Sequence, residues 1–136
     1  MRKFKLVEID QIEVINLEIS KGMYIRFKRY TGAVSIGQIF DVDIDKYNFC
    51  LSIDLGNSRL LFFDKENIVK YSFSLINLIE VGDYVNGVEV EEINDKEIML
   101  VDTHLWIDKE VANRLIESIV TKEQFEACKY VVERNK

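Results

Sequence analysis

Alternation of apolar and polar residues, carried mostly by isoleucine and valine, is the feature that most limits how this chain can fold. It begins near the N-terminus, in Lys3-Phe4-Lys5-Leu6, and continues in Leu17-Glu18-Ile19. A period of two places alternate side chains on opposite faces of a strand, and β-branched residues favour strands. Residues 3–20 are therefore predicted to form a β-hairpin or one long bent strand. The alternative is a helix that has the following residues on one face: Ile9, Ile12, Ile15 and Ile19.

Short strands separated by turn residues are predicted along most of the remaining chain. In the first half, the expected strands cover residues 23–30, 34–44, 49–55, 59–63 and 68–73, and residues 74–79 form a helical turn or a connector. Asn86-Gly87 is the strongest hairpin signal, because Asn and Gly both tolerate the positive φ of a tight turn. Strands are expected after it over residues 88–93, 98–101 and 105–107.

Two helices are predicted near the C-terminus. Val111, Leu115 and Ile119 follow helical spacing behind Asp108, a residue suited to the N-cap, so a helix is expected over residues 108–119. The stretch from Thr121 to Gln124 has the pattern of a capping box, which predicts a helix over residues 122–128. Residues 129–132 are predicted to form a final strand.

The fold class expected from these elements is mostly β with a minor α part. A faint internal repeat relates residues 37–46 to 87–96, and residues 63–66 to 107–110. Both halves then reach an Ile-Val pair, at 68–69 and at 119–120. We expect two small SH3-like β-meanders or barrels, over residues 23–77 and 78–136, after an N-terminal β-hairpin extension over residues 1–22.

Composition excludes several classes of protein. The 136 residues carry a net charge of -6 and are 48% hydrophobic, which is typical of a folded domain rather than of a disordered chain. No apolar run is long enough to span a membrane, and no signal peptide is evident at the start. Two distant cysteines do not form a disulfide framework, so we expect a cytoplasmic protein without membrane contact.

The single histidine argues against metal and acid–base sites that need histidine clusters. His104 lies near Asp102, but no Ser or Cys nucleophile is indicated beside it. Cys50 and Cys128 are predicted to be inert thiols. No phosphate-binding glycine motif is present. We therefore expect a protein that is not an enzyme, with no catalytic residues, no metal and no cofactor.

Charge is distributed unevenly. Residues 1–30 carry seven basic and four acidic side chains, a net of +3; residues 31–80 carry four and seven, a net of -3; residues 81–136 carry seven and thirteen, a net of -6. The acidic side chains of the second half cluster around one predicted hairpin: Glu89, Glu91, Glu92, Asp95 and Glu97. Such a surface could bind a basic groove on a partner protein, in the manner of nucleic-acid phosphates, or could only keep the protein soluble.

A second candidate site lies on the predicted strand over residues 23–30. Its alternation places four basic and aromatic side chains on one face: Tyr24, Arg26, Lys28 and Tyr30. Such a face can stack bases and neutralise phosphates, although the net negative charge of the chain argues against nucleic acid as its partner. Asp41, Asp43 and Asp45 also alternate, but an EF-hand loop would need glycine where Lys46 stands and glutamate where Ser52 stands.

Two segments of the second half resemble a group of uncharacterised small phage and prophage proteins of low-GC Gram-positive bacteria. These segments are residues 78–87, with the pattern LIxVGDYVNG, and residues 116–126, with the pattern IxSIVTKEQFE. The resemblance covers about residues 60–132, and this chain departs from the group in residues 1–22 and 111–115. It implies a phage accessory protein in the host cytoplasm that binds a host protein and inhibits a host defence system, as anti-CRISPR proteins do. Nucleic-acid binding is the alternative function. Residues 1–22 could also pair two copies of the chain as a homodimer, since a two-stranded hairpin is marginal alone.

Overall fold

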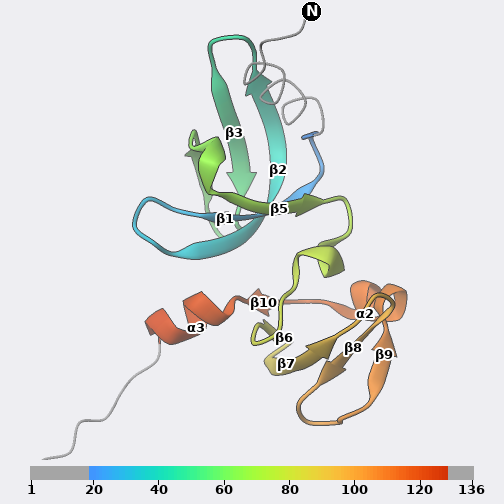
Figure 1. Cartoon of the computed structure of the whole chain (residues 1–136). Coiled ribbons are helices and arrows are strands. Elements are labelled where there is room, and N and C mark those ends of the chain that lie inside the picture. Colours follow the sequence, from blue (N-terminus) through green and yellow to red (C-terminus); the bar gives the residue numbers. More distant parts are fainter. Residues whose placement is uncertain (1–18, 129–136) are drawn as a thin grey trace, which may run out of the picture.

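The computed structural model describes residues 19–128. Within them, two five-stranded antiparallel sheets lie one above the other (Figure 1). The fold is mostly β with a minor helical part, as predicted. The predicted hairpin over residues 1–22 falls outside the described residues except for 19–22, and the predicted strand over 129–132 falls outside them entirely.

The first sheet consists of β1 (Tyr24–Lys28), β2 (Val34–Ile44), β3 (Phe49–Asp54), β4 (Arg59–Phe62) and β5 (Ile68–Ser72). The second consists of β6 (Tyr84–Val85), β7 (Val88–Ile93), β8 (Glu97–Leu100), β9 (Trp106–Asp108) and β10 (Ile119–Val120). Two 3-10 helices, η1 (Lys65–Asn67) and η2 (Leu75–Leu78), and two α-helices, α2 (Lys109–Leu115) and α3 (Lys122–Cys128), complete the described chain.

The helix predicted over residues 108–119 is wrong at its C-terminal end, because α2 stops at Leu115 and Ile119 belongs to β10. The Asn86 side chain gives the physical reason. Its Oδ1 accepts hydrogen bonds from the backbone N–H of Glu117 at 2.7 Å and of Ser118 at 3.0 Å. These two amides would otherwise continue the helical ladder, so the chain leaves the helix and enters a strand.

Both sheets have the same topology. Counted within its own sheet, the first strand lies between the second and the fifth, and the fourth strand forms the far edge. A helix beginning with Lys-Glu joins the fourth strand to the fifth in both: η1 after Asp64 and α2 after Asp108. The structure therefore places the two predicted Asp-Lys-Glu segments at equivalent points of two sheets that share one topology.

An additional repeat, which we did not predict, precedes the first strand of each sheet. The sequence Ile19-Ser-Lys-Gly-Met-Tyr24 corresponds to Ile79-Glu-Val-Gly-Asp-Tyr84. Gly22 and Gly82 adopt nearly the same left-handed φ, 97° and 98°, which glycine adopts without steric cost. Gly22 N–H donates to Ile39 at 2.8 Å, and Gly82 N–H donates to Val90 at 3.0 Å. Both acceptors lie just before a β-bulge in the second strand of their sheet.

The predicted repeat is wrong by one residue at the hairpin turns. Asp45 Oδ1 accepts the N–H groups of Tyr47 and Asn48, both at 2.8 Å. Asn94 Oδ1 accepts the N–H groups of Lys96 and Glu97 in the same way, at 2.9 Å and 2.7 Å. Asp45 therefore corresponds to Asn94 and not to Asp95, since the geometry of the turn selects the residue that caps it.

Each sheet has its own hydrophobic core. The first is formed by Ile19, Ile25, Phe27, Ile39, Leu51, Ile53 and Phe62. The second is formed by Ile76, Ile79, Val85, Val90, Ile98 and Ala112. Because Ile19 is part of the first core, the first unit includes this residue, which lies before the predicted start at residue 23.

Candidate functional site

The four residues predicted as a nucleic-acid surface do not form one. Tyr30 is 96% exposed and Lys28 is exposed, but Arg26 is only 1% exposed and Tyr24 is half-buried. The alternation does place Tyr24, Arg26 and Lys28 on one face of β1. However, the second sheet covers the middle of that face. The prediction is therefore wrong for Arg26, whose guanidinium is not free to contact phosphates.

Arg26 instead joins the two sheets through a buried ion pair with Asp83, which is fully buried. The Arg26 Nη1 and Nη2 groups donate to the two oxygens of the Asp83 carboxylate, and Nη1 also donates to the Leu78 carbonyl at 3.1 Å. Asp83 further accepts the N–H groups of Glu80 at 2.8 Å and Lys122 at 2.9 Å. A bidentate pair with every remaining lone pair occupied is the arrangement that makes burial of two charges tolerable.

Glu80 extends this cluster to the surface. Its carboxylate lies 3.0 Å from Lys122 Nζ, 3.5 Å from Lys70 Nζ and 3.6 Å from Arg26 Nη2. Partial burial alone would raise the pKa of Glu80, but the hydrogen bond from Lys122 and the charges of Arg26, Lys70 and Lys122 lower its pKa below the usual value. The same surroundings act on Arg26: burial would lower its pKa, whereas the hydrogen bond and charge of Asp83 raise it.

The five predicted partner-binding carboxylates lie along the hairpin of β7 and β8. Glu89, Glu92 and Asp95 are exposed, and Glu91 and Glu97 are partly exposed. A β-bulge between Val90 and Glu92 explains how Glu91 and Glu92, although consecutive, can both avoid the core. Among the described residues, Glu91 alone of the five has a side-chain polar partner: its carboxylate lies 2.9 Å from Nδ1 of His104.

An apolar row that we did not predict lies beside these carboxylates. The register aligns Glu92 with Met99, and Met99 with Trp106, across β7, β8 and β9. Ile98 and Ile107 point into the core, so Met99 and Trp106 lie on the outer face. Trp106 is 39% exposed. We call this surface the acidic sheet face, defined by Glu89, Glu91, Glu92, Glu97, Met99 and Trp106.

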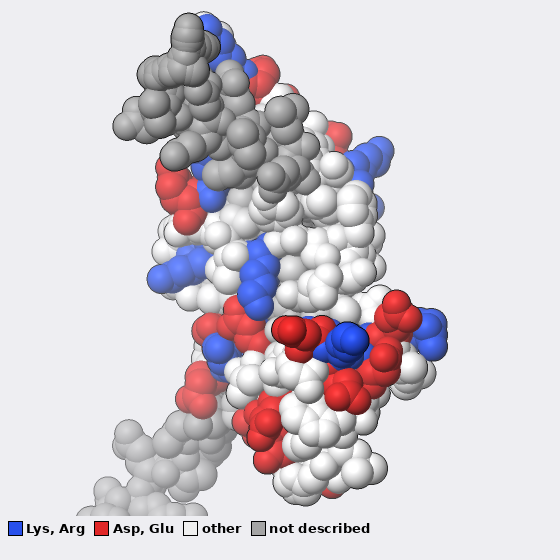
Figure 2. All heavy atoms as spheres, turned by 45° about the vertical axis from the view of Figure 1, so that its right-hand side comes forward, with Lys and Arg blue, Asp and Glu red and all other residues white. Residues whose placement is uncertain are grey.

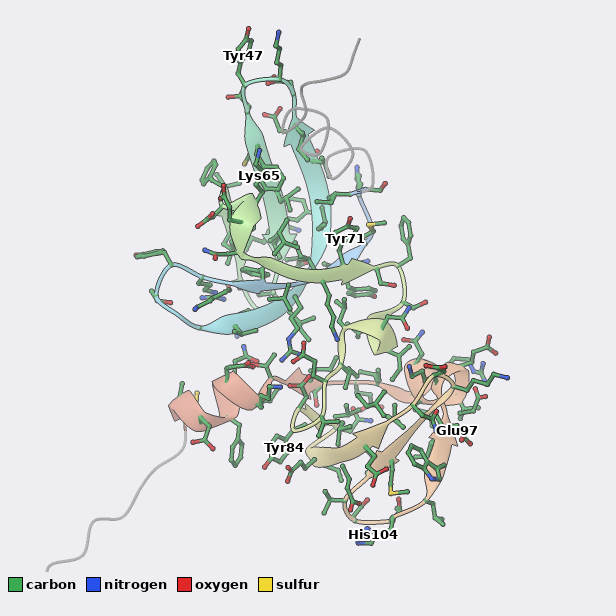
Figure 3. All side chains as sticks on the ribbon, in the orientation of Figure 1. Tyr47, Lys65, Tyr71, Tyr84, Glu97 and His104 are labelled. Carbon is green, nitrogen blue, oxygen red and sulfur yellow. The ribbon has the colours of Figure 1, made fainter. Side chains whose placement is uncertain are left out.

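Negative charge is concentrated in this part of the molecule. Residues 84–108 contain seven acidic side chains and one lysine, a net of -6, which equals the net charge of the whole chain. Most of the acidic surface visible in Figure 2 lies on the lower half, which holds the second sheet. Figure 3 labels Tyr84, Glu97 and His104 in this lower unit.

Glu97 faces a second carboxylate directly. It is the cross-strand partner of Asp108, and the described residues provide no cation between them. Like charges in this position destabilise a sheet. Asp108 has a structural role, since its Oδ1 caps α2 by accepting the N–H of Glu110 at 2.8 Å. Glu97 has no such role among the described residues, so its charge only destabilises the isolated sheet. A basic partner would neutralise this charge.

The other residues considered in the sequence do not come together as a site. Asp45 caps its own turn, and hydrogen bonds from Tyr47 and Asn48 lower its pKa. Burial and the nearby charges of Asp43 and Asp41 raise the pKa of the Cys50 thiol. His104 is exposed in the β8–β9 loop and contacts Glu91. Among residues 19–128, no group of three His, Cys, Asp or Glu side chains is placed to hold a metal ion.

In the same part of the chain, no helix is both long and apolar enough to cross a membrane. Comparisons with protein-family models, with curated proteins and with solved structures gave no match to this chain.

Proposed function

We propose that this chain is a non-catalytic binding protein whose acidic sheet face binds a basic surface of another protein. The observation that carries the proposal is the outward-facing row of Met99 and Trp106 beside carboxylates of which, among the described residues, only Glu91 has a side-chain partner, His104. A surface that only kept the protein soluble would not need an exposed aromatic side chain beside its carboxylates.

The arrangement agrees with the general anatomy of protein interfaces. Binding energy is concentrated in a few central residues, among which tryptophan is enriched, and a polar rim surrounds them. Charges at the rim steer a partner of opposite sign and set its orientation. Trp106 would supply the main apolar contact, and Glu89, Glu92 and Glu97 would select a basic partner.

We further propose that the partner is a host protein and that the chain is a phage accessory protein acting on host defence. The support for this step is the resemblance of residues 78–87 and 116–126 to phage and prophage proteins of low-GC Gram-positive bacteria. Arg26 is buried in an ion pair with Asp83, which argues against nucleic-acid binding through β1.

Affinity capture with matched baits tests the proposal. The wild-type chain and the triple variant Glu89→Lys/Glu92→Lys/Glu97→Lys are immobilised and exposed to lysate of a low-GC Gram-positive bacterium at about 50 mM salt. We expect the wild type to retain a basic polypeptide that the triple variant loses, because charge reversal repels such a partner.

A control variant changes the net charge equally at a distant place. Asp41→Lys/Asp43→Lys/Glu66→Lys also raises the net charge by six, at exposed positions of the first unit. This control is expected to retain the partner. Equal loss in both triple variants would show nonspecific attraction by charge and would contradict the proposal, as would retention by both.

A further inference from the structure

A groove of about 440 Å³ lies between the two sheets, on a surface separate from the acidic sheet face. Its apolar walls come from both units: Ile36 and Leu55 from the first, Leu75 from η2, and Ile116 from the segment after α2. The volume falls within the range of clefts that bind ligands, and such clefts often lie where two units meet.

One side of the groove is the free edge of β10. This strand is at the edge of the second sheet and pairs on one side only, with β6. Asn86 N–H donates to the Ser118 carbonyl at 2.9 Å, so the Ser118 carbonyl points toward β6. Successive residues of an antiparallel strand point their backbone groups to opposite sides. The N–H and C=O of Ile119, which lines the groove, therefore point away from β6.

The charge of the groove is negative. Asp54 and Glu117 both line it, and no lysine or arginine does. Neither carboxylate takes part in an ion pair with a described residue. An unpaired edge between apolar walls is the setting in which an extended peptide adds as a strand, with backbone hydrogen bonds for affinity and side-chain contacts for specificity.

We propose that this groove binds an extended peptide segment of alternating aliphatic and basic residues, which pairs with β10 at Ile119. Its backbone N–H and C=O groups bond to those of Ile119. Its aliphatic side chains pack against the apolar walls, and its lysine or arginine approaches Asp54 and Glu117. The site does not depend on the proposed function of the acidic sheet face.

Titration of the full chain, labelled with 15N, against capped pentapeptides tests the site. The probes are Ac-Val-Lys-Val-Lys-Val-NH2 and Ac-Val-Glu-Val-Glu-Val-NH2. We expect the lysine probe to shift the amide signals of Ile119, Ser118 and Gln38, and to bind at least about tenfold more tightly than the glutamate probe. No shift with either probe, equal affinity for both, or shifts confined to β7 and β8 would overturn the proposal.

Two further measurements separate backbone pairing from attraction by charge. A lysine probe methylated on the nitrogen of its central valine cannot donate there, and we expect it to bind at least about fivefold more weakly. Unchanged affinity would overturn the strand pairing. Glu117→Lys, an exposed position, should weaken the lysine probe by a similar factor, whereas the control Glu66→Lys should not. Equal effects of these two variants would overturn the role of Glu117.

Discussion

Arg26 and Asp83 are the two side chains on which the joining of the two sheets depends most. In the internal repeat, Met23 stands where the second unit has Asp83, and Asn86 stands where the first unit has Arg26. The two units therefore differ at both positions, and the first supplies the cation while the second supplies the anion.

Loss of one partner should destabilise the protein strongly, because the other charge stays buried without compensation. We predict that Arg26→Met and Asp83→Asn each lower the free energy of unfolding by about 3–5 kcal/mol. The double variant should lose less than the sum of the two, by about 1–3 kcal/mol. Urea unfolding measures all three proteins. Single-variant losses below about 1 kcal/mol would show that the pair contributes little.

Glu80 makes the stability of the contact between the two sheets depend on pH. Its pKa is lower in the folded protein than the usual value of about 4.3, so its contribution to stability is complete above that value and is lost as the pH falls through the folded pKa. We predict that stability declines as the pH is lowered from about 5 to 3, and that Glu80→Gln reduces this decline. Urea unfolding at several pH values measures it. The same pH dependence in both proteins would contradict the assignment.

Strands β7, β8 and β9 carry the proposed binding surface, and one cross-strand pair among them opposes folding. Glu97 faces Asp108 across the sheet, although like charges at such positions destabilise a sheet. We predict that Glu97→Lys raises the free energy of unfolding by about 0.5 kcal/mol and also weakens partner binding. Thermal unfolding and capture from lysate measure the two effects. If Glu97→Lys lowered the free energy of unfolding, repulsion between Glu97 and Asp108 would not destabilise the free protein.

The elements differ in how well the sequence predicts them. β2 matches its prediction at both ends, because alternation and the flanking turns are local signals. The end of α2 could not be predicted, because it depends on Asn86, which lies 31 residues before Glu117. The prediction of Arg26 as a nucleic-acid contact is wrong for a similar reason. Its alternation with Tyr24 and Lys28 is a local signal, but its partner Asp83 lies 57 residues away in the sequence. The acidic residues of the candidate site were visible in the sequence. The apolar row between them required the register of three strands.

The whole molecule consists of two small units of the same topology that have acquired different surfaces. The first has a long β2–β3 hairpin that extends away from the second sheet, with Tyr47 at its tip (Figure 3). The second holds a charge equal to that of the entire chain within residues 84–108. We propose that the first unit and the Arg26–Asp83 pair hold the second unit in place, and that the second unit binds the partner.

Trp106, the only tryptophan of the chain, allows this claim to be measured directly. The wild-type protein is titrated with the polypeptide that the wild-type bait retains, while the tryptophan emission of the chain is recorded against a blank titration of the partner alone. We predict that the emission of Trp106 moves to shorter wavelength as the partner covers it, and that Glu92→Lys raises the concentration for half-saturation at least about tenfold, which corresponds to 1.4 kcal/mol. Emission that stays unchanged at saturation would contradict the assignment of the acidic sheet face as the binding surface.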